Sequence, residues 1–371
     1  MATLDALDTP CLVLDRARVA ANATRLRRHL AALGVPLRLH VKTAKSLEAT
    51  SLALEGKPAP ITVSTLKEAE RFLDAGYTDI LYAVGFEPHK RARAEALAAK
   101  GARLTLLVDS VEGARGAGGF PTLIEIDTDG HRAGVKPDDA AQLVAIARAL
   151  EANGATCAGV LTHAGGSYNC ASVEAITAIA EQERAGAVKA VETLRHAGFA
   201  APVVSIGSTP TATCTKKLDG VTEVRAGVFV FFDLVMAGIG VCRLEDLALS
   251  VLATVIGHRA DKGWVLIDAG WMALSRDRGT ARQRVDQGYG LVCDADGRPI
   301  EGLVVADANQ EHGIVARRDG GPLAPMAVGT RLRILPNHAC ATGAQHDRYH
   351  VVDAAHSGRA VLANWGRFSG W

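Results

Sequence analysis

The stretch from residue 37 to residue 43, LRLHVKT, alternates apolar and polar side chains, which is the pattern of a β-strand with one apolar face. The polar side chains of this predicted strand share the other face: Arg38, His40 and Lys42. Helix-like stretches flank the strand, so we expect it in a parallel sheet, and in a closed barrel its polar face points inward. Lys42 would then lie at the carboxyl end of the strand, where a desolvated lysine can form a Schiff base. The stretch alone fits an edge strand with a solvated polar face equally well.

Strand-like runs alternate with helix-like stretches through the first two thirds of the chain. The predicted strands are 37–43, 61–65, 79–84, 103–109, 122–128, 156–163, 202–208 and 223–231. The predicted helices are 16–33, 66–75, 88–100, 136–152, 171–198 and 209–219, and any helix in the short glycine-rich link 110–121 is brief. Eight alternations predict a (β/α)8 barrel, with an open doubly wound sheet as the competing arrangement.

The alternation of predicted strands and helices stops at about residue 245, after which no long helix pattern occurs. Strand-like runs there are separated by Gly, Asp and Pro: 248–257, 264–269, 302–306, 313–316 and 330–335. We therefore predict a barrel domain over 12–240 and a mostly antiparallel β domain over 245–371, joined by residues 1–11. The short strand predicted at 11–15 is a further candidate for the β domain, which would make that domain discontinuous.

Composition excludes several classes of partner. Of the 371 residues, 48% are hydrophobic and 22% charged, which is typical of a globular protein. The net charge of +1 gives no reason to expect nucleic acid or an anionic membrane as partner. Seven scattered cysteines and an amino terminus without a signal-peptide pattern predict a cytoplasmic protein with reduced thiols.

The sequence Gly207-Ser208-Thr209, which follows the seventh predicted strand, is a candidate phosphate loop. Glycine permits close backbone approach, and two hydroxyls with nearby N–H groups suit a phosphate. In barrels, phosphate is often bound after the seventh and eighth strands. An ordinary helix N-cap at Ser208 or Thr209 is the simpler alternative.

Two glycine-rich loops follow the fifth and sixth predicted strands, DTDGHRAG at 127–134 and THAGGSY at 162–168. Their polar and aromatic side chains, His163 among them, would line a cofactor ring. A plain turn and a satisfied core histidine are the alternatives.

The sequence Pro336-Asn-His-Ala-Cys340 suggests a metal site. If it is a strand, His338 and Cys340 share a face, and imidazole with thiolate favours zinc. Two ligands would leave coordination positions open for water or substrate. A buried cysteine beside a lone histidine is the alternative, and His312 in the polar cluster 309–313 is a candidate base or further ligand.

Taken together, these motifs resemble the metal-activated fold-type III pyridoxal-phosphate enzymes that act on β-hydroxy-D-amino acids. The resemblance covers almost the whole chain. It is carried chiefly by LDTP (7–10), HVKTAKS (40–46), VSTLKEAE (63–70), EIDTDGHRAGV (125–135), LTHAGGSY (161–168), SIGSTPT (205–211), LDGVTEVRAGVFVFFDLV (218–235), DAGWMALSRDRGTA (268–281), ANQEHGI (308–314) and LPNHACATGAQ (335–345).

The resemblance implies an alanine-racemase-like barrel followed by a β domain, in a homodimer. It implies that Lys42 carries pyridoxal 5'-phosphate and that His338 and Cys340 bind a divalent metal, zinc in first place, with manganese, cobalt or magnesium as alternatives. The other implied cofactor contacts are His40, Arg132, His163, Tyr168, Gly207, Ser208 and Thr209. The chain departs from the family at Leu39, where proline is usual, and at Ala44, where histidine or serine is common; Ala44 would alter substrate contacts.

The implied activity is a lyase reaction, the dehydration of a small β-hydroxy-D-amino acid. The cofactor would store the carbanion formed when Lys42 removes the α-proton, and the metal would act as Lewis acid on the β-oxygen. The favoured substrate is D-threo-3-hydroxyaspartate, giving oxaloacetate and ammonia, with Arg276 or Arg278 as candidates for its second carboxylate. Dehydration of D-serine and aldol cleavage of D-threonine are the alternatives. A pyridoxal-phosphate carrier without turnover, a cofactor-free phosphate-binding barrel and an amino-acid racemase are rival interpretations.

Overall fold

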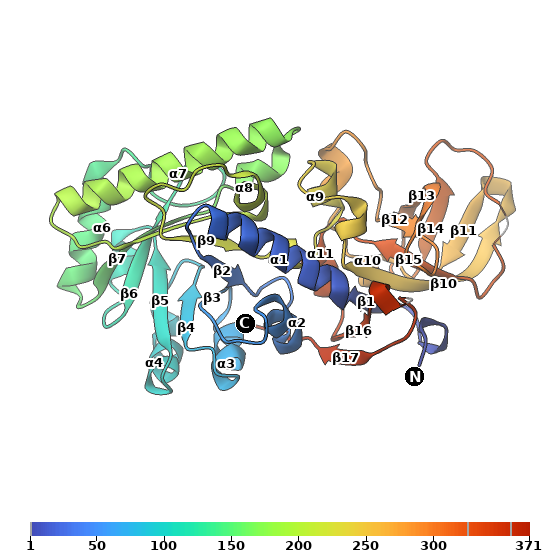
Figure 1. Cartoon of the computed structure of the whole chain (residues 1–371), viewed down its shortest axis with the longest axis horizontal. Helices are drawn as coiled ribbons and strands as arrows, with labels where there is room; N and C mark the ends of the chain where they lie inside the picture. Colours follow the sequence, from blue (N-terminus) through green and yellow to red (C-terminus); the bar gives the residue numbers. More distant parts are fainter. Residues whose placement is uncertain (1, 325, 357) are drawn as a thin grey trace. The chain divides into compact units, whose positions relative to one another are not determined.

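The computed structural model describes residues 2–324, 326–356 and 358–371 (Figure 1). The chain divides into two compact units. The barrel unit comprises Thr24–Lys42, Leu54–Gly227 and Gly370–Trp371, and the β unit comprises Met1–Ala23, Thr43–Ala53 and Val228–Ser369. This division differs from the predicted limits 12–240 and 245–371, since the chain enters the β unit three times.

The barrel unit is built on eight parallel strands that close into a barrel. They are β2 (Leu37–His40), β3 (Ile61–Val63), β4 (Asp79–Tyr82), β5 (Arg103–Val108), β6 (Pro121–Ile126), β7 (Thr156–Thr162), β8 (Val203–Ile206) and β9 (Glu223–Ala226). The ladder between β2 and β9 closes the ring, with Leu37 paired to Val224. The closed barrel is confirmed and the open sheet is wrong; most strands end earlier than predicted, where the chain turns into the loops.

Helices follow most of the strands, as the sequence predicts. They are α1 (Arg16–Ala32), α2 (Leu47–Ala53), α3 (Leu66–Asp74), α4 (Arg91–Ala99), α5 (Val111–Ala114), α6 (Ala140–Ala152), α7 (Val173–His196) and α8 (Thr209–Cys214). The longest, α7, packs along β7 and β8 (Figure 1). Within the described ranges, no helix has the length and apolarity that crossing a membrane requires.

Charged side chains of β2 face the barrel interior. The guanidinium of Arg38 donates to Glu223 and to Asp79, each at 2.7 Å. Arg225 on β9 donates to Ser205 Oγ at 2.8 Å and also to a backbone carbonyl of β7. Buried charge of this kind is tolerated only when it is paired or hydrogen-bonded. The inward polar face predicted for this strand is therefore confirmed, and a solvated edge strand is excluded.

The β unit contains a nine-stranded sheet in the order β11-β14-β13-β12-β15-β10-β1-β16-β17. An additional pairing of β10 with β11 closes six of these strands into a ring. Among the described residues of this sheet, only β1 and β16 pair in parallel. The strands are β1 (Cys11–Asp15), β10 (Leu249–Arg259), β11 (Trp264–Ile267), β12 (Leu291–Cys293), β13 (Pro299–Ala308), β14 (Gly313–Arg317), β15 (Arg331–Leu335), β16 (Arg348–Val352) and β17 (Ala363–Gly366). Short helices link them: α9 (Leu234–Gly238), α10 (Trp271–Leu274) and α11 (Ala339–Gly343).

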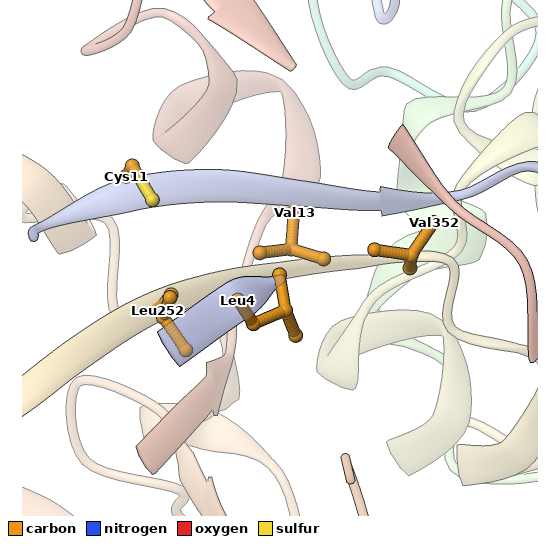
Figure 2. Close-up of a cluster of buried hydrophobic side chains, with 5 residues drawn as sticks. All are labelled: Leu4, Cys11, Val13, Leu252 and Val352. Atoms are coloured by element: carbon orange, nitrogen blue, oxygen red, sulfur yellow. The ribbon is translucent and has the colours of Figure 1, made fainter. Parts of the chain in front are cut away.

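The amino-terminal strand β1 is part of the β unit because its side chains complete a core there. Figure 2 shows a buried cluster formed by β1, β10, β16 and the short 3-10 helix η1 (Leu4–Ala6). Its members are Leu4, Cys11, Val13, Leu252 and Val352. The antiparallel ladder between β1 and β10 pairs Cys11 with Leu252 and thereby holds the cluster together.

We expect Leu252→Ala to lower the free energy of unfolding by about 2–5 kcal/mol, because the side chain is fully buried and its removal leaves a cavity. Equilibrium unfolding in denaturant measures this change. Ile256→Ala is the matched control on the same strand: its side chain is 42% exposed, and we expect a loss of less than about 1 kcal/mol. Equal losses for the two variants would contradict the assignment of this core.

Candidate functional site

Lys42 follows the first barrel strand and is exposed. Strand β2 ends at His40. Val41 N still donates to Thr62 O of the neighbouring strand at 3.0 Å, and the chain then turns away from the sheet. The prediction of a strand through residue 43 and of a desolvated lysine is therefore wrong. The chain leaves the sheet before Lys42, so the residue is exposed, although its positive charge still acts on His40 and His163.

Two imidazoles lie at this end of the barrel, as the sequence predicts for His40 and His163; that of His40 is buried and that of His163 half-buried. The Nδ1–H of His163 donates to Gly207 O at 3.1 Å, which leaves Nε2 as an acceptor. Burial, reinforced by the positive charge of Lys42, lowers the pKa of His163 to about 3. Burial and the charges of Lys42 and Arg225 hold the pKa of His40 well below its usual range. Both rings are therefore neutral near pH 7.

The loop at Gly207 requires glycine. Its φ is +131°, and a Cβ there would lie 2.2 Å from the carbonyl oxygen of Arg225. Ser208 caps α8 by accepting a bond from Thr211 N at 3.2 Å, and its Oγ lies 2.9 Å from Ser167 Oγ. The N-cap that the sequence offered as the simpler reading of Ser208 is thus present, and Thr209 is buried beside it.

The two glycine-rich loops lie against each other. Asp129 accepts a bond from Gly166 N at 2.7 Å, and Arg132 reaches back to Glu125 at 3.1 Å. The ring of Tyr168 lies 6.2 Å from that of His163, measured between centroids. The structure therefore brings His163, Tyr168 and the loop at Gly207 together, while the guanidinium of Arg132 is largely exposed.

A buried carboxylate that the sequence analysis missed fixes two of these loops. Glu183, on α7, accepts hydrogen bonds from Ala164 N and Gly207 N, each at 3.0 Å. Burial raises its pKa. Because one oxygen binds the backbone after β7 and after β8, it sets the spacing of the two loops. No local signal marked this residue, which lies in the middle of a long helix.

The second group of predicted residues lies in the β unit, on a helix and not on a strand. Strand β15 ends at Leu335, before Pro336, and His338 is the N-cap of α11, which contains Cys340. The strand expected here is wrong, because the chain bends into a helix after the proline. The two side chains still meet, since the thiol of Cys340 is a hydrogen-bond partner of His338.

Both side chains have further polar neighbours. His338 Nδ1 lies 2.6 Å from a carboxylate oxygen of Asp277, and Cys340 Sγ donates to Thr43 Oγ1 at 3.2 Å. Burial opposes the charged form of His338, but Asp277 and Cys340 outweigh it and raise its pKa to about 11. Between the two residues, Ala339 N donates to the buried carboxylate of Asp233 at 3.0 Å.

The remaining predicted residues have other surroundings or partners. His312 is exposed on the hairpin between β13 and β14. Arg276 lies over the ring of Trp271 at 4.3 Å, and Arg278 forms an ion pair with Asp286 at 2.6 Å. Among the residues that the structure describes, no three His, Cys, Asp or Glu side chains form a group that could hold a metal ion. His312 is therefore not a third ligand beside His338 and Cys340 in this conformation.

The donor sets suit two different groups. An amine, neutral imidazoles, hydroxyls and a glycine without room for Cβ suit a phosphorylated cofactor with an aldehyde. An imidazole whose Nδ1 is held by a carboxylate, in contact with a thiol, suits zinc.

Comparison with known proteins gives two matching family models. Residues 14–235 match "Alanine racemase, N-terminal domain", and residues 248–352 match "Putative serine dehydratase domain". The chain is 56% identical to the D-threo-3-hydroxyaspartate dehydratase of Delftia sp. (strain HT23), over 100% of this chain and 99% of that protein. It is 30% identical to the D-serine dehydratase of Dictyostelium discoideum, over 94% of each chain.

Two solved structures of D-threo-3-hydroxyaspartate dehydratase mutants are also similar to the chain. A histidine-to-alanine mutant and a cysteine-to-alanine mutant, the latter in the metal-free form, each match with a TM-score of 0.96 and 55% identity. Each match covers 100% of this chain, and 97% and 100% of the respective mutant chains. The two mutated residues lie two positions apart, the spacing of His338 and Cys340.

We expect the neutral state of His163 to make the ligand-free protein less stable in acid. Its pKa is about 3 when folded and 6.5 in the unfolded chain, so the unfolded state binds more protons between these values. Stability is therefore lost as the pH falls from 6.5 towards 3, with a slope from this residue of up to about 1.4 kcal/mol per pH unit.

His163→Asn should flatten this part of the pH dependence, measured by denaturant unfolding at several pH values. His196→Asn, at an exposed histidine on α7, is the control and should retain the wild-type slope. An unchanged slope in His163→Asn would contradict a neutral imidazole at this position.

Proposed function

This chain belongs to the fold-type III pyridoxal-phosphate family that joins an alanine racemase N-terminal domain to a serine dehydratase domain, and we propose that it dehydrates D-threo-3-hydroxyaspartate to oxaloacetate and ammonia. The observation that carries the proposal is the contact between His338 and Cys340, within a chain 56% identical to a dehydratase of that substrate. The solved structure of a cysteine mutant of D-threo-3-hydroxyaspartate dehydratase, in the metal-free form, supports the same assignment.

Pyridoxal phosphate is the cofactor of this family, and the barrel unit offers residues that fit it. We assign the covalent attachment to Lys42, an exposed residue just beyond the end of the first barrel strand. We assign the remaining contacts to the groups gathered at the same end of the barrel: His40, Arg132, His163, Tyr168, Gly207, Ser208 and Thr209. The absence of space for a Cβ at Gly207 and the neutral imidazole of His163 support this assignment.

We assign the divalent metal to His338 and Cys340, with zinc as the first candidate. Nitrogen and sulfur donors favour zinc over magnesium, and only two side-chain ligands are proposed, so positions remain for water or substrate. Manganese and cobalt remain alternatives. The bond from His338 Nδ1 to Asp277 leaves Nε2 for the metal.

The proposed chemistry divides between the cofactors and the side chains. When bound, pyridoxal phosphate supplies an electron sink for the α-carbon, and the metal supplies a Lewis acid for the departing hydroxyl. The amine of Lys42 removes the α-proton of the substrate and holds it. His163 orients the loop at Gly207 through its Nδ1–H, and it stays neutral while it does so. His312 remains a candidate for a second proton transfer.

Three further expectations belong to this proposal. The substrate carries a second carboxylate, for which Arg276 is the better candidate because Arg278 is already paired with Asp286. We also keep the homodimer and the cytoplasmic location as predictions.

The deciding experiment incubates the protein with D-threo-3-hydroxyaspartate, D-serine and D-threonine side by side and identifies the products. We expect oxaloacetate and ammonia from the first substrate, at the highest kcat/KM of the three. Glycine with an aldehyde as the main product would assign the chain to the aldolases instead. Highest efficiency with D-serine would assign it to the D-serine dehydratases, and a coloured protein without turnover would make it a carrier.

We expect Lys42→Ala to abolish dehydration, because both the covalent attachment and the proposed base are lost. Borohydride reduction of the wild type, followed by peptide mapping, should place the cofactor on Lys42. Lys45→Ala is the matched control, three residues along the chain, and should retain the cofactor. A cofactor that reduction still fixes to Lys45 in the Lys42→Ala variant would refute the assignment.

A further inference from the structure

We propose that Asp277 is a positioning residue for the metal, which orients His338 so that its Nε2 faces the ion. This inference rests on the proposed function, since it takes His338 and Cys340 as the metal ligands. Asp277 lies in the segment Ser275-Arg-Asp-Arg278, where the sequence drew attention to the two arginines and not to the carboxylate between them.

The carboxylate of Asp277 accepts from two groups, the backbone N–H of Gly279 and the imidazole of His338. Its carboxylate lies 2.6 Å from His338 Nδ1, and an ionised carboxylate can only accept, so the imidazole donates. This bond fixes the tautomer and the plane of the ring, and it increases the electron density at the other nitrogen. A carboxylate that accepts from a metal-bound histidine is a recurrent arrangement in zinc sites.

The backbone before Asp277 is held in a conformation that needs support. Ser275 ends α10 with φ +76° and ψ 156°, a region that residues other than glycine rarely adopt. Its hydroxyl accepts from Asp277 N at 3.1 Å, and its own N–H bonds to Trp271 O at 2.9 Å. The strained residue therefore redirects the chain and fixes the backbone of Asp277.

Contacts between α10 and α11 keep the two partners in register. Thr342, on α11, donates through its hydroxyl to Leu274 O at 2.8 Å. His346, just beyond α11, bonds to Ala273 O at 3.0 Å. These bonds join the helix that precedes Asp277 to the segment that carries His338. They therefore hold the Asp277 and His338 side chains at the distance of their hydrogen bond.

The neighbouring arginines do not compete for this carboxylate. Arg278 is paired with Asp286 at 2.6 Å, and Arg276 lies over the ring of Trp271. Within the described part of the chain, Asp277 does not form a three-residue ligand group with His338 and Cys340. Its role therefore acts through His338 and not through direct coordination.

The test is a titration of the metal-depleted, pyridoxal-phosphate-loaded protein with Zn²⁺ against a competing chelator. We expect Asp277→Ala to raise the Kd for Zn²⁺ by about 10- to 100-fold, the usual effect of removing such a partner. Asp277→Asn should lose less, because the amide oxygen still accepts the Nδ1–H. Asp286→Asn is the matched control, a similarly exposed carboxylate nine residues further along the chain, and its Kd should stay within about twofold of the wild type.

A second readout follows the ring directly. In ¹⁵N-histidine-labelled, zinc-loaded protein, His338 should carry its proton on Nδ1, with its signal assigned from His338→Gln. Asp277→Ala should weaken that preference, whereas a merely structural loss would not change the tautomer. Melting temperature and cofactor absorbance report whether each variant is folded.

The outcomes separate the inference from the function on which it rests. Wild-type affinity and an unchanged tautomer in Asp277→Ala would overturn the positioning role alone. Equal losses in Asp277→Ala and Asp286→Asn would overturn it too, because the effect would then be general electrostatics. A wild type that does not bind Zn²⁺, or His338→Gln that binds it as tightly, would overturn the metal site itself.

Discussion

The barrel depends on the neutralisation of the charges that its first strand turns inward. Arg38 lies between Glu223 and Asp79, on strands from both sides of β2, and its charge would be prohibitively costly to bury alone. The same alternation places His40 on the inner face, where burial keeps it uncharged. The need to pair these charges therefore sets which face of β2 points inward. Because β2 ends at His40, Lys42 follows two residues beyond the end of the strand.

The strand and helix pattern predicted the barrel because each of its elements is a local signal. Buried strands read as apolar runs, and the polar residues of β2 and β9 showed which face points inward. Strands β12, β16 and β17 were missed because they are short and their burial depends on partners far along the chain. The segment at His338 was assigned to a strand because its i, i+2 spacing fits one, although Pro336 ends β15 and a helix follows.

The residues of the candidate site divide into those that residue type indicates in the sequence and those that only the fold brings together. Lysine, His-X-Cys and Gly-Ser-Thr are recognisable as types. Asp277 and Glu183 are ordinary acidic residues in the sequence, and only folding brings them to His338, 61 positions away, and to the loops at Ala164 and Gly207. The exposure of Lys42 was also missed, because an inward strand says nothing about the residue that follows its end.

The backbone of Ser275 has a consequence for engineering this protein. A side chain held in a region suited to glycine stores roughly 1–3 kcal/mol. Selection for thermal resistance alone favours substitutions that remove such strain. Ser275→Gly is one of them, because glycine adopts this backbone conformation without strain. The gain would come at the segment that carries Asp277. A variant library screened by melting temperature alone would therefore favour sequences in which this loop is less ordered, so the screen should also follow the bond between Asp277 and His338.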